Sequence, residues 1–447
     1  MIKNETVRIS ITDITAEGAG VGRHEGMAVF VPRTAAGDVI DAKIVKVKPN
    51  YAFGIIDKII SPSKSRIEPD CPCFNKCGGC VFRHIDYKSE LEIKENRVRE
   101  ALRRIAGADV KSGGITGGGR INAYRNKAQF PFAASGEAGF FAPRSHRVIP
   151  IKTCPLLPDE FISAAECVSE FIADNGITVY NEQTGAGLVR HLYIRKGAVS
   201  GEIMVTLVLN GDTLPFADNL VSRLKALLGD NLKSVQINVN KKDTNVILGD
   251  KCKVVYGAAD ITDTLCGIKL RLSPFTFYQV NHEMAEKLYS KVKEYAEPDG
   301  KNIIDLYCGA GSIGLSLCGS AKSVTGVEII PEAIEDAKIN AAANGIRNAD
   351  FICGDAAAAA KTLAKRGVHA DVVIVDPPRK GCDGDLLNTI ANSFKPQRIV
   401  YVSCDPGTLA RDVKILLSLG YSAKEYSVFD MFPRTGHVET VVLLSRQ

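Results

Sequence analysis

From about residue 270 onward, short apolar runs typical of strands alternate with segments of helical periodicity. The runs include residues 323–328, 371–375 and 398–402. This alternation predicts a mostly parallel sheet with helices on both faces. Open sheets of this class bind their ligands at the carboxyl ends of the strands. The loops that follow these strands are therefore where chemistry is expected.

Three strand ends in this region carry residues suited to a nucleotide-like cofactor. Residues 305–314 (DLYCGAGSIG) form a glycine loop that lets a ligand approach the backbone. The next strand ends in Glu328, whose carboxylate suits ribose hydroxyls, and a dinucleotide site would have these same two features. Residues 376–379 (DPPR) separate the alternatives. In Rossmann-like methyltransferases a proline loop of this kind lies between cofactor and target base, whereas hydride transfer does not need it.

A cysteine follows the strand at 398–402, within residues 403–412 (SCDPGTLARD). Cys404 is placed to react at the expected cofactor edge. Uracil C5 attacks a sulfonium methyl group only after a thiolate adds at C6 and makes C5 nucleophilic. The C5 proton must then be removed, and Glu439 in residues 432–439 (FPRTGHVE) is the candidate base. Taken alone, this segment also fits a surface pair of His437 and Glu439 with no chemical role.

Thirteen cysteines in a chain without a recognisable export signal suggest a reducing compartment, where cysteines are metal ligands, nucleophiles or core residues. Cys71, Cys77 and Cys80 have the spacing C-x5-C-x2-C, which indicates a metal site. Zinc and an iron–sulfur cluster are both compatible with it. Cys73 either replaces Cys71 as a ligand or packs nearby. Small buried positions are expected for the remaining cysteines, Cys167, Cys252, Cys266, Cys308, Cys318, Cys353 and Cys382.

The N-terminal part of the chain has a different sequence pattern. Residues 1–60 contain short alternating segments punctuated by glycine and proline, which predicts a small antiparallel barrel with Gly18, Gly20 and Gly22 on its first long loop. Residues 1–150 carry 24 Lys and Arg against 16 Asp and Glu, a net +8 that leaves −3 for the rest. This asymmetry suits an N-terminal half that faces phosphates. A solvated basic surface without a partner fits the charge equally well.

Apolar residues at helical spacing around residues 91–105 predict a helix with a basic face, and the chain from residue 120 to 265 has an α+β pattern. The basic residues of the helix are Lys94, Arg97, Arg99, Arg103 and Arg104. Residues 124–130 (YRNKAQF) interleave basic and aromatic side chains. They are expected either to line an RNA channel or to form a strand edge with solvated charges.

Four motifs together resemble the bacterial RNA uracil-C5 methyltransferase family, and the resemblance spans nearly the whole chain. They are residues 305–309, 376–379, 403–412 and 432–439. The resemblance implies that Cys404 is the nucleophile and Glu439 the proton acceptor, and that the uridine must leave its stack to reach the thiol. It also implies four contacts to S-adenosylmethionine: Gln279, Tyr307, Glu328 and Asp376. Only the resemblance singles out Gln279, in residues 275–281 (FTFYQVN).

The same resemblance extends to the barrel and the cysteines. Residues 18–23 (GAGVGR) and 29–32 (VFVP) resemble a TRAM domain, an OB-like RNA-binding barrel. The family favours a [4Fe-4S] cluster over zinc, with four ligands: Cys71, Cys77, Cys80 and Cys154. The three-cysteine motif of radical S-adenosylmethionine enzymes has a different spacing. The cluster is therefore expected to be structural or to position RNA.

The expected organisation is a TRAM barrel at 1–60, a central α+β domain with the cysteine cluster at 61–265, and an α/β, Rossmann-like methyltransferase domain at 266–447. The implied activity is methyl transfer from S-adenosylmethionine to uridine C5 in RNA. Family members with both the barrel and the cluster usually act on 23S rRNA, which is favoured over tRNA. The alternatives are a tRNA uridine, another RNA atom such as cytosine C5 or an exocyclic amine, and an RNA-binding factor with a vestigial site. A cytoplasmic location, with no membrane or protein partner, is expected.

Overall fold

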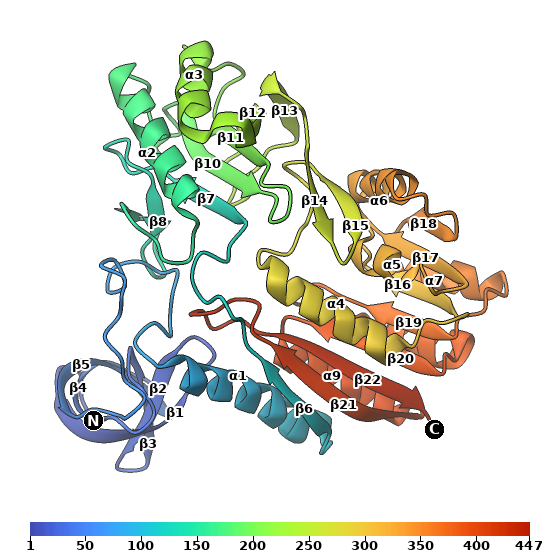
Figure 1. The fold of residues 1–447 in the computed structure, drawn as a ribbon. Coiled ribbons are helices and arrows are strands. Elements are labelled where there is room, and N and C mark those ends of the chain that lie inside the picture. The colour runs from blue at the N-terminus through green and yellow to red at the C-terminus, as the bar shows by residue number, and fades with distance from the viewer.

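The computed structural model describes residues 1–447, and the first five strands close into a barrel (Figure 1). The strands pair in the order β1-β2-β3-β5-β4. Alternate residues of β1, such as Val7, Ile9 and Ile11, point into the barrel core, as a period-two pattern predicts. The bounds are β1 (Thr6–Ile14), β2 (Ala19–His24), β3 (Met27–Pro32), β4 (Val39–Val47) and β5 (Tyr51–Ser61).

The glycine-rich segment that was predicted as a loop is largely strand β2, which pairs with β1 and β3. A Cβ on Gly20 would collide with the Thr34 side chain, and one on Gly22 would press against the Ser10 carbonyl oxygen. These glycines allow close packing inside the barrel. A sequence pattern does not distinguish that role from the flexibility of a loop, which explains the error.

A long helical segment follows the cysteine-rich stretch. α1 (Tyr87–Ala101) begins after Asp86, whose side chain accepts a hydrogen bond from Ser89 N. It continues as the π-helical turn η1 (Leu102–Ala106), which ends at Gly107 with a φ of 67°. The predicted basic face is only partly correct, because Lys94 is 1% exposed and forms buried ion pairs. Periodicity alone does not identify a lysine whose partners come from distant segments.

The middle of the chain is a five-stranded sheet in the order β13-β12-β11-β10-β7. Helices α2 and α3 pack on one face of it over a core that includes Phe161, Leu192 and Leu220. The sheet strands are β7 (Lys127–Pro131), β10 (Val189–Lys196), β11 (Ile203–Leu209), β12 (Leu232–Val239) and β13 (Lys251–Gly257). The remaining elements are β8 (Gly139–Phe141), β9 (Val148–Pro150), α2 (Asp159–Asp174), α3 (Ala217–Leu228) and the 3-10 turn η2 (Gly229–Asn231).

The C-terminal part is an eight-stranded sheet in the order β18-β17-β16-β19-β20-β22-β21-β6, preceded by a hairpin. The hairpin is β14 (Ile261–Leu265) and β15 (Ile268–Leu272). The sheet strands are β6 (Lys111–Thr116), β16 (Asn302–Leu306), β17 (Ser323–Glu328), β18 (Ala349–Cys353), β19 (Val372–Val375), β20 (Arg398–Ser403), β21 (Tyr421–Phe429) and β22 (Glu439–Arg446). Strands β16 to β20 are parallel, which confirms the predicted α/β fold class.

Helices cover both faces of this sheet over two separate cores. One core takes side chains from α4, α5 and α6, and the other from α7, α8, α9 and the α1–η1 segment. The helices are α4 (His282–Ala296), α5 (Ser312–Leu317), α6 (Pro331–Ala343), α7 (Ala356–Lys365), α8 (Gly384–Thr389) with the π turn η3 (Ile390–Phe394), and α9 (Pro406–Ser418).

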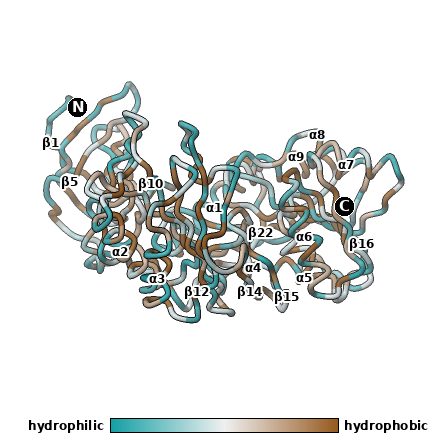
Figure 2. The backbone as a smooth tube through the Cα atoms, turned by 90° about the horizontal axis from the view of Figure 1, so that it is seen from above, coloured by the Kyte–Doolittle hydropathy of each residue, from teal (hydrophilic) through white to brown (hydrophobic).

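The edge strand β6 comes from the first third of the chain and lies beside β21 (Figure 1). Residues 87–116, which the sequence assigns to the central domain, thus pack against the C-terminal sheet; the boundaries at 60 and 265 stay predictions. Seen from above, α1 lies between the barrel and the C-terminal helices (Figure 2). None of the helices has both the length and the apolar character that a membrane crossing requires.

Candidate active site and cysteine-lined cavity

Cys404 lies at the carboxyl end of β20, in the short turn that leads into α9. The helix begins after Asp405, whose carboxylate accepts hydrogen bonds from Gly407 N and Thr408 N, both 2.9 Å long. Pro406 occupies the first helical turn, where its missing N–H is not needed. Cys404 is half-buried. The sequence thus fixes this cysteine between a buried strand and a capped helix, at the sheet edge where ligands bind.

Glu439 lies opposite Cys404 across two antiparallel strands. The last registered pair of β20 and β22 is Ser403 with Thr440, so Cys404 and Glu439 occupy the next positions of the same register. Glu439 is 6% exposed and is also the register partner of Phe429 on β21. Strand pairing therefore brings together two residues that are 35 positions apart in the sequence.

The charges around this pair determine its protonation. Burial, together with the nearby carboxylates of Glu439 and Asp376, raises the pKa of the Cys404 thiol to about 11, and Arg379 opposes this shift. Burial also raises the pKa of Glu439 well above the usual value for a carboxyl group, with Asp376 adding to the effect and Arg379 opposing it. A carboxylate with a raised pKa is a stronger proton acceptor. The raised pKa of Glu439 thus favours proton acceptance, whereas the raised pKa of Cys404 disfavours the thiolate in the RNA-free protein.

The glycine loop after β16 is held against the end of β17. Tyr307, Gly309 and Gly311 have positive φ values of 66°, 53° and 80°. Glu328 accepts hydrogen bonds from Gly309 N (3.2 Å) and Ile330 N (3.0 Å). The backbone of the loop is therefore fixed by the carboxylate that the sequence assigns to a cofactor. Tyr307 and Glu328 lie at the same edge because β16 and β17 are paired.

Two further carboxylates lie at this edge. Asp376 follows β19, which pairs with β16, and burial raises its pKa to about 6. Asp305, at the end of β16, accepts a hydrogen bond from Gly314 N (2.9 Å), but its other oxygen is buried without a partner. Burial and the charges of Asp376 and Glu328 raise its pKa to about 7. An unpartnered buried carboxylate oxygen fits a ligand that donates hydrogen bonds, and sequence reasoning did not single out Asp305.

Gln279 lies between β15 and α4 and is 7% exposed. Its main-chain carbonyl accepts a hydrogen bond from Asn126 Nδ2 (2.8 Å). Arg195, on β10, donates to the carbonyls of Ser273 (2.7 Å) and Thr276 (2.6 Å) just upstream. The central sheet thus holds this segment in place. No hydrogen bond joins Gln279 to Tyr307, Glu328 or Asp376.

Five cysteines surround a cavity of about 240 Å³ in the central part of the chain: Cys71, Cys73, Cys77, Cys80 and Cys154. Burial raises the pKa of Cys154 to about 12, with further contributions from neighbouring thiols. No three His, Cys, Asp or Glu side chains converge closely enough to hold a metal ion. Thiols around a space suit a polynuclear cluster better than a single ion.

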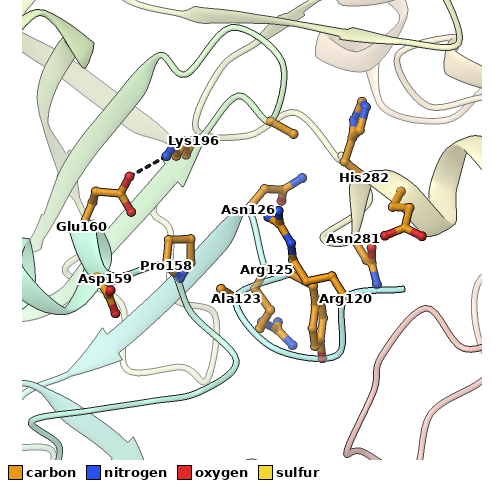
Figure 3. A pocket seen from close by; sticks show the side chains of 13 residues that line it. Arg120, Ala123, Arg125, Asn126, Pro158, Asp159, Glu160, Lys196, Asn281 and His282 are labelled. Atoms are coloured by element: carbon orange, nitrogen blue, oxygen red, sulfur yellow. Dashed lines mark hydrogen bonds and ion pairs between the residues drawn. The ribbon is translucent and has the colours of Figure 1, made fainter. Parts of the chain in front are cut away.

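A separate pocket of about 630 Å³ lies between the central segment and the start of α4 (Figure 3). Arg120, Arg125 and His282 line it, and Lys196 forms an ion pair with Glu160 at its rim. Arg125 also lines the cysteine cavity. Neither Cys404 nor Glu439 lines this pocket. It is formed in part by residues 123–126, from the segment whose sequence fits either an RNA channel or a strand edge.

Two family models and several known proteins match this chain. The family model described as tRNA (Uracil-5-)-methyltransferase matches residues 86–447, and the TRAM domain model matches residues 3–56. A protein of Halalkalibacterium halodurans named as an uncharacterized RNA methyltransferase is 44% identical over 447 residues, covering 99% of this chain and 97% of its own. A protein of the same description from Listeria monocytogenes is 42% identical over 446 residues, covering 99% and 98%.

The fold also matches a solved structure over almost its whole length. The Pyrococcus abyssi tRNA (uracil-54, C5)-methyltransferase in complex with S-adenosyl-L-homocysteine superposes with a TM-score of 0.78. It is 29% identical in sequence, and the match covers 98% of this chain and 100% of the other.

Proposed function

Because the chain belongs to the tRNA (uracil-5-)-methyltransferase family and carries a TRAM domain, we propose that it methylates C5 of a specific uridine through a covalent Cys404 adduct. As a member of this family it is an S-adenosylmethionine-dependent RNA methyltransferase. The observation that carries the proposal is the opposition of Cys404 and Glu439 at the open end of the β20–β22 ladder. Methylation of an exocyclic amine needs no such thiol.

The proposed steps use these two residues in turn. Cys404 Sγ, as the thiolate, adds to C6, and the electron pair of the C5=C6 bond moves toward C5 and O4. When bound, S-adenosylmethionine would supply the methyl group that C5 takes and would leave as S-adenosylhomocysteine. Glu439 accepts the C5 proton, the C5=C6 double bond forms again, and the Sγ–C6 bond breaks to release the Cys404 thiolate. The raised pKa of Glu439 favours its role as proton acceptor.

The proposed cofactor contacts are Gln279, Tyr307, Glu328 and Asp376. Support comes from the glycine loop that Glu328 fixes and from the buried unpartnered oxygen of Asp305 beside it. A base in a duplex does not reach a half-buried thiol, so the uridine is proposed to flip out of its stack or to lie in an unpaired loop.

We favour 23S rRNA as the substrate, since family members with this combination of barrel and cysteine cluster usually act on it. A tRNA uridine is the second candidate, because the Pyrococcus abyssi relative is named for tRNA uracil-54. The basic N-terminal half, including the exposed Arg99, Arg103 and Arg104 of α1, suits either RNA backbone. The protein would act on either RNA in the cytoplasm, which is a reducing compartment.

We also propose that Cys71, Cys77, Cys80 and Cys154 hold a [4Fe-4S] cluster, with zinc as the alternative. The cavity between the thiols supports the cluster. Burial raises the pKa values of Cys77, Cys80 and Cys154 and so favours their neutral thiols, whereas a bound metal centre would favour their thiolates. When bound, the cluster would cross-link segments 71–80 and 154 rather than take part in methyl transfer. Cys73, whose sulfur lies 4.0 Å from the Pro150 carbonyl oxygen, is left as a neighbour.

The test uses transcripts of 23S rRNA and of tRNA in which uridine is replaced by 5-fluorouridine. Fluorine cannot leave as a proton does, so the native protein with S-adenosylmethionine is expected to form an adduct that survives denaturation. Cys404→Ala should abolish it, and Cys353→Ala, which removes an exposed cysteine, should not. The transcript that yields the adduct identifies the RNA. Methylation of ordinary RNA without any adduct would refute the covalent mechanism.

A further inference from the structure

A buried ion cluster joins α1 to the loop between β21 and β22. Glu90 and Lys94 lie one helical turn apart on α1, and both side chains are at most 2% exposed. Lys94 Nζ donates to Glu90 Oε1 (2.7 Å), Asp430 Oδ1 (2.6 Å) and the Phe432 carbonyl (3.2 Å). A charged lysine in such a place requires its partners, because unpaired charge in the protein interior is strongly unfavourable.

The remaining oxygens of the cluster are also used. Arg434 donates from its backbone N to Glu90 Oε1 (2.7 Å) and from its guanidinium to Glu90 Oε2 (3.3 Å). Tyr87 OH donates to Asp430 Oδ2 (2.8 Å). Two cations and two anions therefore balance in a closed site. Since every carboxylate oxygen has a partner, a shift of the loop would break several charged hydrogen bonds at once.

The loop so held, residues 430–438, is the segment that leads directly into Glu439. Phe429 and Glu439 are the last registered pair of β21 and β22, and Asp430 follows Phe429 immediately. Lys94 therefore binds Asp430, which follows Phe429, and Phe429 pairs with Glu439, the proposed proton acceptor. Figure 1 shows this red loop reaching toward α1.

Other parts of the chain hold the same loop. Val81 N and Phe82 N, just after the cysteine segment, both donate to the Arg434 carbonyl (2.9 and 3.2 Å). Arg97 donates to the Gly436 carbonyl (2.8 Å). A Cβ on Gly436 would collide with the Ala16 carbonyl oxygen of the barrel.

We propose that Lys94, acting through Glu90 and Asp430, is a positioning residue for Glu439 and controls the second half of the reaction. In that half the C5 proton passes to the Glu439 carboxylate, the electron pair of the C5–H bond forms the C5=C6 bond, and the Sγ–C6 bond breaks with its electron pair staying on Cys404 as the thiolate. The first half depends on Cys404, which β20 and the Asp405 cap hold independently of Lys94. The inference rests on the covalent mechanism proposed above.

The test separates formation of methylated RNA from its release. Lys94→Met is mixed with S-adenosylmethionine carrying a labelled methyl group and ordinary substrate RNA in a single turnover. Samples quenched over time are resolved on a denaturing gel into free methylated RNA and methylated RNA attached to protein. We expect label to enter RNA at within about threefold of the native rate, whereas release slows by about tenfold or more and the attached species accumulates.

Two further proteins complete the design. Lys338→Met replaces an exposed lysine of α6 and should behave as native in both steps. The double variant Lys94→Met/Asp430→Asn removes one cation and one anion, so the buried charges stay balanced. It serves as the test protein if the single variant does not fold. It should also accumulate attached RNA. Release at the native rate from either folded variant, or equal slowing of both steps, overturns the proposal.

The proposed function fails in a different way. If the native protein forms no adduct with 5-fluorouridine RNA, the covalent mechanism is wrong whatever the Lys94 variants do. If the native protein forms the adduct and the folded variants release RNA normally, only the positioning role of Lys94 is wrong.

Discussion

The protonation of Cys404 gives a prediction that requires no RNA. Its pKa is raised from 9.0 to about 11, so at pH 8 roughly one molecule in a thousand carries the thiolate, against about one in ten for an unperturbed thiol. Alkylation of Cys404 by iodoacetamide should therefore be about tenfold to a hundredfold slower than for an unperturbed thiol at pH 8, because the higher nucleophilicity of a high-pKa thiolate offsets part of its lower abundance. The rate should rise about tenfold for each pH unit between pH 7 and 10.

Substitutions of the neighbouring charges should shift this rate in opposite directions. Asp376, whose pKa is about 6, is ionised throughout that range and disfavours the thiolate, so Asp376→Asn should speed alkylation. Arg379 favours the thiolate, so Arg379→Gln should slow it. Loss of one unit charge beside a half-buried thiol should change the rate by about threefold to tenfold, because the effective dielectric constant near a protein surface is high.

The assay follows the Cys404 peptide by mass spectrometry after timed alkylation of the RNA-free protein. The peptide containing Cys353, an exposed cysteine on the same sheet, serves as the internal reference. A Cys404 midpoint at or below pH 9, or a shift of both variants in the same direction, would show that burial and these charges do not control the thiol.

Three further outcomes follow from the site. Glu439→Gln should methylate RNA but release it about 10² to 10⁴ times more slowly, and release at the native rate in quenched-flow measurements would contradict the role of Glu439 as proton acceptor. Because burial raises the pKa of Glu439, native release should quicken with rising pH as this carboxyl group loses its proton. Cys154→Ser, purified without oxygen, should lose iron and visible absorption relative to Cys167→Ser, and retention of both would exclude Cys154 as a ligand. Arg195→Met should raise the KM for S-adenosylmethionine about tenfold with little change in kcat, because it removes two charged hydrogen bonds to the backbone just before Gln279. An unchanged KM would show that this segment does not contribute to cofactor binding.

Residues at strand ends were the easiest to predict. The sequence places Cys404 after an apolar run, and the sheet then determines where that cysteine lies. Glu439 was harder, because its relation to Cys404 depends on antiparallel pairing of β20 and β22 that no local pattern records. Chemistry and resemblance single out Cys404 and Glu439 in the sequence, but only the folded structure shows that the two residues lie opposite each other.

What the sequence did not reveal depends on partners far along the chain. Lys94 has the spacing of a basic helix face, and its burial depends on Asp430, 336 residues away, as well as on the nearby Glu90. Asp305 begins a recognisable motif, yet its unpartnered oxygen is visible only when the surrounding backbone is in place. Gly20 and Gly22 were predicted to lie on a loop, because a glycine needed for close packing looks the same in the sequence as a glycine in a flexible loop.

The edge strand β6 has a consequence for how the protein is made. Its residue Lys111 pairs with Glu425 on β21, 314 positions later in the chain. At a synthesis rate of about 5 to 20 residues per second, β6 waits roughly 15 to 60 seconds on the ribosome before its partner emerges. During that time the apolar side of η1, with Leu102 and Ala106, has no core to join. The barrel and central sheet can fold early, but the catalytic sheet closes only when nearly all of the chain has been translated.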